Sequence, residues 1–179
     1  MREGTISWLF GCHSIIHSYY VVRAWKILFK RWPKFWELVC ILVHDIGIVG
    51  KDYLTYEEEK KCHWKRGAKI AHKLFGYAAF FLVMDHDSIG LETHKSWSDE
   101  LTDWSEYIDD RLFKADKYSY YIAHKTWLKM NCIVELKLKA PGMTITESIN
   151  DFKKRVKESI DSGKWASNHS FYLERCKDD

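Results

Sequence analysis

Residues 38–50 read LVCILVHDIGIVG and place a histidine and an aspartate, His44 and Asp45, inside an almost entirely apolar run. One apolar stripe leads up to this pair at helical spacing: Phe35, Leu38, Val39 and Leu42. The pattern predicts a helix that begins near Lys34 and ends at the pair. An imidazole and a carboxylate buried side by side cost free energy unless they are paired or bind a metal. The stretch therefore favours a metal site.

The composition is that of a globular protein. Of the 179 residues, 46% are hydrophobic and 30% are charged, so the chain can bury a sizeable core. We expect one domain over 1–179, with a motif-bearing core over about 6–130 and a helical extension over about 143–179. The net charge of +3 is compatible with an anionic small-molecule substrate and does not require a nucleic-acid partner.

The five cysteines include no C-x-x-C pair, which argues against a zinc ribbon and a thioredoxin-like site. Their odd number and apolar surroundings favour a reducing, cytoplasmic compartment. Residues 4–22 carry no charge and are long enough to span a membrane, but their histidines, serines and glycines favour a buried helix instead. We therefore expect no membrane partner.

Hydrophobic periodicity predicts an all-α, multi-helix bundle, and the presence of only two prolines suits long helices. Residues 132–138 alternate and fit either a short strand or a helix end, and 52–61 reads as a charged loop or a short exposed helix. The spacing of Thr144 and Glu147 is that of a capping box. The other predicted helices cover about 6–30, 34–45, 62–75, 99–110 and 112–130, and one more follows the capping box. Trp32-Pro33 is expected to end the first of these, and Gly76 is a candidate break before an apolar run over 77–84.

Adjacent residues on a helix point about 100° apart, so further ligands for His44 and Asp45 must come from other helices. The candidates are His13, His17, His63, His86, Asp87 and Asp116. His13 and His17 lie one turn apart on the predicted first helix, and spacing alone leaves both open as the upstream ligand. For His63 and His86 the alternatives are a polar residue at a helix start and a loop histidine.

The order of these residues resembles the HD-domain superfamily of metal-dependent phosphohydrolases. The resemblance covers about residues 13–120. The matching elements are an upstream histidine, His44-Asp45-Ile46-Gly47, His63-x-x-x-Gly67-Ala68, Asp85-His86-Asp87 and Ala115-Asp116-Lys117. It implies a compact helical bundle with a metal site in its core, holding one or two divalent ions of Mn, Fe, Co, Ni or Zn, with Mg also compatible.

The resemblance also implies roles for individual residues. His17 suits the upstream position better than His13, because His17-Ser18 is followed by Val21-Val22 and Ala24, as in the family's usual first helix. The implied metal ligands are His17, His44, Asp45, His63, His86 and Asp116, with His13 and Asp87 as additional or alternative ligands. The implied catalytic residues are Asp45, His63, Arg66 and Lys117, of which the two cations would contact phosphate.

The implied activity is hydrolysis of a phosphoester or phosphoanhydride bond in a nucleoside mono-, di- or triphosphate or a dinucleoside polyphosphate. A non-catalytic or nuclease-type nucleic-acid-binding protein on the same scaffold is the alternative, and a homo-oligomer is compatible with either. The chain departs from the family's residue pattern at two points, which limits what the resemblance implies. Ile48 replaces a lysine that often follows the family's His-Asp-x-Gly, and no Gly-Tyr-Pro tripeptide occurs, so cyclic-di-GMP hydrolysis is not indicated.

Overall fold

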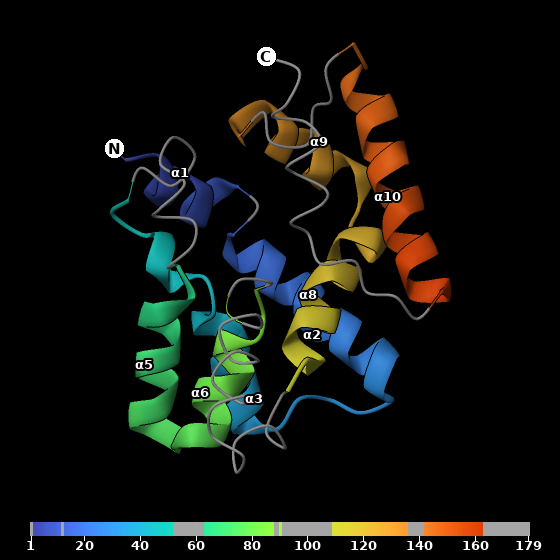
Figure 1. The fold of residues 1–179 in the computed structure, drawn as a ribbon. Helices are drawn as coiled ribbons and strands as arrows, with labels where there is room; N and C mark the ends of the chain where they lie inside the picture. Colours follow the sequence, from blue (N-terminus) through green and yellow to red (C-terminus); the bar gives the residue numbers. More distant parts are fainter. Residues whose placement is uncertain are drawn as a thin grey trace.

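The computed structural model describes residues 2–11, 13–51, 63–87, 90, 109–135 and 142–162. Every regular element within these ranges is a helix, as the periodicity predicts (Figure 1). The elements are α1 (Glu3–Phe10), α2 (Ile15–Phe29), α3 (Phe35–Val43), the short 3-10 helix η1 (Ile46–Ile48), α5 (Trp64–Phe75), α6 (Tyr77–Met84), α8 (Arg111–Ile122), α9 (Lys125–Glu135) and α10 (Ile145–Asp161).

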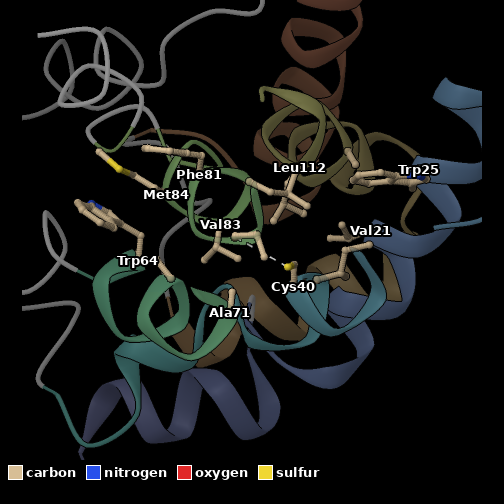
Figure 2. Close-up of a cluster of buried hydrophobic side chains, with 14 of the residues drawn as sticks. Val21, Trp25, Cys40, Trp64, Ala71, Phe81, Val83, Met84 and Leu112 are labelled. Atoms are coloured by element: carbon tan, nitrogen blue, oxygen red, sulfur yellow. Dashed lines mark hydrogen bonds between the residues drawn. The ribbon is translucent and has the colours of Figure 1, made fainter. Parts of the chain in front are cut away.

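The central helix of the described part is α3, which contacts α2, α5 and α6, while α2 lies along α8 and α5 along α6. Its buried side chains join those of its neighbours in one apolar cluster, which includes Val21, Trp25, Cys40, Leu82 and Leu112 (Figure 2). Removing such side chains from water is the main stabilising contribution to a core of this kind. The His44-Asp45 pair comes directly after α3, which ends at Val43. The pair therefore lies next to the core.

The predicted first helix over 6–30 is wrong in one respect: the chain breaks between Phe10 and Ile15. Gly11 is extended (φ −104°, ψ −151°) and ends α1, and Ser14 occupies the N-cap position of α2, although its side chain makes no capping hydrogen bond. His13 therefore lies in the turn and not on a continuous helical face shared with His17. The predicted end before Trp32-Pro33 is confirmed, since α2 ends at Phe29.

The predicted helix over 112–130 is also two helices, separated at Ala123 and His124. Tertiary contacts satisfy the backbone groups that the break leaves free. The Nζ of Lys153 donates to the carbonyls of Tyr121 (2.8 Å) and Ala123 (2.6 Å), and the His124 amide donates to the Tyr20 hydroxyl (3.2 Å). Neither glycine nor proline marks this break, so the sequence pattern gave no local signal for it.

Other local predictions are confirmed. Gly76, with φ of +81°, separates α5 from α6, and the amides of Thr144 and Glu147 donate to each other's side chain at 2.8 and 3.3 Å. Residues 132–135 belong to α9, which ends at Glu135. For these residues the helix-end alternative is therefore confirmed. The predicted element at 52–61 and nearly all of the helix predicted over 99–110 lie outside the described residues.

Candidate metal centre

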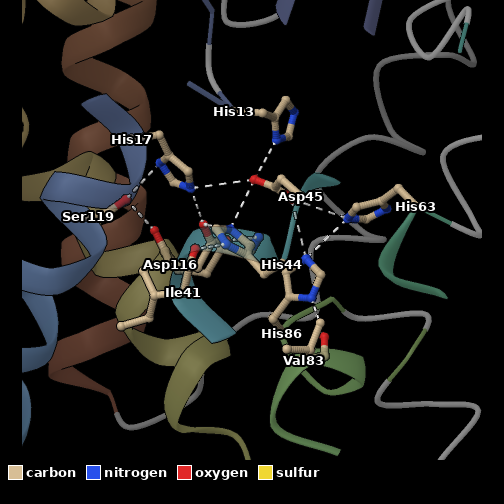
Figure 3. A network of polar contacts seen from close by, with 11 residues as sticks. His13, His17, Ile41, His44, Asp45, His63, Val83, His86, Asp116 and Ser119 are labelled. Carbon is tan, nitrogen blue, oxygen red and sulfur yellow. Dashed lines mark hydrogen bonds and ion pairs between the residues drawn. The ribbon is translucent and has the colours of Figure 1, made fainter. Parts of the chain in front are cut away.

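Five imidazoles and two carboxylates meet between the helices, and all of them are buried (Figure 3). They come from six separate positions in the fold, as a site in the core of a helical bundle requires. The residues are His13 in the α1–α2 turn, His17 on α2, His44 and Asp45 after α3, His63 at the start of α5, His86 after α6 and Asp116 on α8.

Asp45 lies at the middle of the group, and its two carboxylate oxygens face different partners. Oδ2 lies 2.9 Å from His44 Nε2, 3.8 Å from His17 Nε2 and 2.8 Å from His13 Nδ1. Oδ1 lies 3.5 Å from His86 Nε2 and 3.7 Å from His63 Nε2. One carboxylate therefore joins two clusters of imidazole nitrogens, one on each side.

Asp116 completes the first cluster. Its Oδ1 lies 2.7 Å from His17 Nε2 and 3.9 Å from His44 Nε2. Ligand atoms of His17, His44 and Asp116 lie within 4.8 Å of one another, and so do those of His44, Asp45 and His86. Each group is compact enough to surround one ion, and His44, which belongs to both, can bind in only one of them at a time.

The local chain direction fixes which nitrogen of two histidines faces the centre. His44 and His86 each follow the end of a helix, where backbone carbonyls lack helical partners. His44 Nδ1 donates to the Ile41 carbonyl at 2.6 Å, and His86 Nδ1 donates to the Val83 carbonyl. Because a carbonyl only accepts, Nδ1 carries the proton in both rings. In the neutral rings, Nε2 then offers a lone pair to the centre.

Ser119 fixes the orientation of a third imidazole, that of His17. The sequence pattern did not identify this serine as part of the site. Its hydroxyl donates to the Asp116 carbonyl at 2.6 Å, which leaves an oxygen lone pair facing His17 Nδ1 at 3.4 Å. His17 Nε2 is then the atom that faces Asp116. The available signal was the position of Ser119, three residues beyond Asp116 on the same helix.

The donor atoms fit a metal better than they fit one another. The Nε2 atoms of His17 and His44 are buried and, within the described chain, make no hydrogen bond of good geometry. The Nε2 atoms of His63 and His86 lie only 3.1 Å apart. Two ligands that bind one transition metal at about 2.0–2.1 Å lie about 3 Å apart. A shared cation would therefore satisfy the buried His17 and His44 nitrogens, and the spacing of the His63 and His86 nitrogens suits a second one.

Charges within the group strongly perturb its acid–base behaviour. Burial lowers the pKa of His17, and the close, charged Asp116 only partly opposes this. Burial acts in the same direction on His44, but the charge and contact of Asp45, the charge of Asp116 and the Ile41 carbonyl together outweigh it and raise the pKa to about 9. Burial would raise the pKa of both carboxyl groups, yet the neighbouring cations and imidazoles hold the pKa of Asp45 and of Asp116 well below the usual range. Both aspartates are thus carboxylates, as metal ligands must be.

Gly67 allows α5 to approach the end of α3. A Cβ atom at this position would lie 2.4 Å from the Val43 carbonyl oxygen and 3.0 Å from that of His44. Both distances are too short for a side chain, so only glycine permits this helix crossing. The crossing places His63, at the start of α5, beside the His-Asp pair.

The remaining predicted site residues are placed as follows. Asp87 is half-buried and belongs to neither compact group, although its Oδ2 is buried without a hydrogen-bond partner in the described structure. Lys117 Nζ lies 2.7 Å from Asp116 Oδ2, the oxygen that faces away from His17. Arg66 is exposed on α5. Contacts of Arg66 and Lys117 with phosphate stay predictions.

No protein-family model, curated protein or solved structure matches this chain. Among the described helices, none is both long enough and apolar enough to cross a bilayer. The evidence for the site is therefore its own geometry: buried imidazole and carboxylate groups that could hold a metal ion.

Proposed function

We propose that the chain is a metal-dependent phosphohydrolase of the HD-domain type that hydrolyses a phosphoester or phosphoanhydride bond of a nucleotide. The observation that carries the proposal is the position of Asp45, whose two oxygens face separate sets of imidazole nitrogens. A carboxylate that bridges two sets of ligands is the arrangement expected of a two-metal hydrolase.

The donor set suits divalent transition ions, because neutral imidazole and carboxylate are good ligands for Zn, Mn, Fe, Co and Ni. The first ion would be held by His17, His44, Asp116 and Oδ2 of Asp45, and the second by His63, His86 and Oδ1 of Asp45. When bound, such ions lower the pKa of coordinated water toward about 7 and withdraw charge from a phosphoryl oxygen.

The protein itself supplies orientation and charge. Oδ2 of Asp45 is held by His13 at 2.8 Å, which fixes the carboxylate between the two ligand sets. Lys117 pairs with Asp116 and keeps it ionised. Arg66 and Lys117 would neutralise the charge that develops on the phosphate, as transition-state stabilisation requires. The half-buried Tyr120 ring lies 5.1 Å from that of His17 and offers an aromatic surface beside the site, which suits a nucleobase.

The test is phosphate release from a panel of nucleotides by the full-length protein, freed of metal and reloaded with Mn, Co, Ni, Zn, Fe or Mg. We expect turnover with at least one ion, and a loss of about 100-fold or more in kcat for His17→Ala and Asp116→Ala, since each removes a ligand. Turnover of p-nitrophenyl phosphate in the same series separates general phosphatase activity from nucleotide preference.

The matched control is His72→Ala, which removes an exposed histidine of α5 that lies outside both groups. It should leave turnover unchanged. Absence of turnover with every metal and every substrate, from protein shown to be folded and metal-loaded, would refute the proposal. Cleavage of RNA or DNA without any nucleotide turnover would favour the nuclease alternative instead.

A further inference from the structure

Six large apolar side chains are exposed around the turn that joins α1 to α2. On α1 these are Ile6 (37% exposed), Leu9 (41%) and Phe10 (63%), and on α2 they are Ile15 (67%), Ile16 (46%) and Tyr19 (56%). We call these residues the α1–α2 face. Single exposed apolar residues are ordinary on a protein surface, but so many within fourteen residues of chain mark an interaction surface.

The outward side of α2 exposes apolar and cationic side chains along the whole helix. Beyond Tyr19, helical spacing places Arg23, Ile27 and Lys30 on the same side, and all three are exposed. The Arg23 guanidinium lies 6.0 Å from the centre of the Tyr19 ring and donates to its hydroxyl. A surface helix of a globular protein usually turns charges of both signs outward, whereas α2 turns apolar groups and cations outward.

Acidic residues are absent from the sequence of α2 and of α1 beyond Glu3. Residues 4–36 contain no aspartate or glutamate, and neither do residues 117–134, although the whole chain has 25 acidic residues. The second segment includes most of α9, which packs against α1 and exposes Lys125, Lys129 and Met130. In Figure 1, α1 and α9 lie at the same end of the molecule. The α1–α2 face is therefore apolar, and the charged side chains of its own and the neighbouring acid-free segment are cations.

We infer that the α1–α2 face docks the protein onto an anionic membrane surface, with Phe10 and Ile15 entering the headgroup region and Arg23 and Lys129 near the phosphates. Exposed apolar side chains with flanking Arg and Lys are what interfacial binding to acidic lipids uses, whereas insertion of a spanning helix is not needed. Peripheral docking departs from the expectation of no membrane partner, which was argued only from the lack of a suitable spanning segment.

Two other occupants fit the surface less well. A second copy of the same face would bring cations against cations, with no acidic side chain of 4–36 to balance them. A nucleic acid would use the cations but would leave isoleucine, leucine and phenylalanine against a phosphate backbone that has no apolar groups to match.

Co-sedimentation of the full chain with vesicles tests the inference. We expect binding to phosphatidylcholine vesicles that contain phosphatidylserine, and much weaker binding to phosphatidylcholine alone. Phe10→Ser and Ile15→Ser should each weaken the binding by about tenfold, since each withdraws a large apolar group from the interface. Arg23→Glu should weaken it by about tenfold or more at low salt, with a smaller effect at high salt.

Leu74→Ser is the matched control, because Leu74 is an aliphatic side chain of similar exposure (58%) on α5, outside this face. It should leave vesicle binding unchanged, and circular dichroism should show that all four variants are folded. Failure to bind acidic vesicles, or equal losses from Leu74→Ser and Ile15→Ser, would overturn the inference. So would dimerisation that Phe10→Ser abolishes, or binding of RNA in place of vesicles. None of these results depends on phosphatase activity.

Discussion

Gly47 lies against the backbone of His63: a Cβ atom on Gly47 would fall 1.6 Å from the His63 carbonyl oxygen. Gly67 makes the reciprocal approach to the carbonyls of Val43 and His44. The two segments that carry the His44-Asp45 pair and His63 thus cross through a glycine on each side. The crossing explains why these two motifs contain glycine, and it sets the distance between His63 and Asp45.

Gly47→Ala should therefore destabilise the protein and at the same time displace His63, a ligand of the second set. A methyl group at this point meets backbone and not a side chain that can move aside, so we expect the free energy of unfolding to fall by about 1–3 kcal/mol or more. Urea unfolding measures the loss. Lys69→Ala, at an exposed position of α5, should change stability by no more than about 0.5 kcal/mol. Equal stability of Gly47→Ala and the wild type would show that the segments do not cross in this way.

The bridging position of Asp45 predicts how the metal content responds to single substitutions. His86→Ala should retain the ion of the first set and lose the second, and Asp116→Ala should do the reverse. Asp45→Ala should lose both, because each oxygen serves one set. Metal analysis of protein equilibrated with a defined excess of Mn or Co gives the stoichiometry. One ion in the wild type, with His86→Ala unaffected, would argue for a single site.

The centre was largely predictable from the sequence, because ligand chemistry leaves a strong residue pattern. His44, Asp45, His63, His86 and Asp116 were all named in advance, and the structure brings them together. The acceptors that orient the rings were not predictable in the same way. Ile41 and Val83 act through carbonyls, which every residue has, and these carbonyls are available only because a helix ends just beyond them.

Helix boundaries were less predictable than the site. The break near Gly11 had a local signal, a glycine followed by Ser14, a residue type preferred at N-caps, but the apolar periodicity on both sides concealed it. The break at Ala123 had no local signal, since Lys153 of α10 supplies the hydrogen bonds that make it stable. Periodicity is judged over the length of one helix, so it does not reveal a hydrogen bond between Lys153 and Ala123, which lie thirty residues apart.

Metal binding should become tighter as the pH rises toward about 9. In the metal-free protein the pKa of His44 is raised from 6.5 to about 9, because its contacts with Asp45, Asp116 and the Ile41 carbonyl together outweigh the effect of burial. The stabilising His44–Asp45 ion pair is thus fully present below pH 6.5 and is lost as the pH rises through about 9. A metal needs the neutral ring, so uptake between these values must release the proton. Calorimetry in buffers of different ionisation enthalpy measures that release.

The same titrations in His72→Ala should give an unchanged proton count, because this exposed imidazole belongs to neither ligand set. Metal affinity that does not vary between pH 6.5 and 9 would show that His44 is not protonated in the metal-free centre.

Glu37 predicts a non-additive pair of substitutions. Its buried carboxylate accepts two hydrogen bonds from Arg31 at 2.6 Å and one from Arg111 at 2.8 Å, and these charges lower its pKa although burial would raise it. Either Arg31→Ala or Arg111→Ala leaves one guanidinium in place. The double variant leaves the buried carboxylate without a cation and with only the Lys34 amide, at 2.7 Å, as a donor. We therefore expect a combined loss of about 3–5 kcal/mol that exceeds the sum of the single losses. Additive losses in urea unfolding would exclude coupling through Glu37.

The buried amide of Asn131 predicts a substitution that stabilises the protein. Asn131 is fully buried on α9, and neither its oxygen nor its nitrogen has a hydrogen-bond partner in the described structure. Leucine has the same branching as asparagine and no polar atoms, so Asn131→Leu should raise the free energy of unfolding by about 1–3 kcal/mol. Asn150→Leu, at an exposed position of α10, controls for the added apolar group and should have an effect within about 0.5 kcal/mol. A loss of stability in Asn131→Leu would contradict the prediction, either because a buried water satisfies the amide or because the larger leucine overpacks the site.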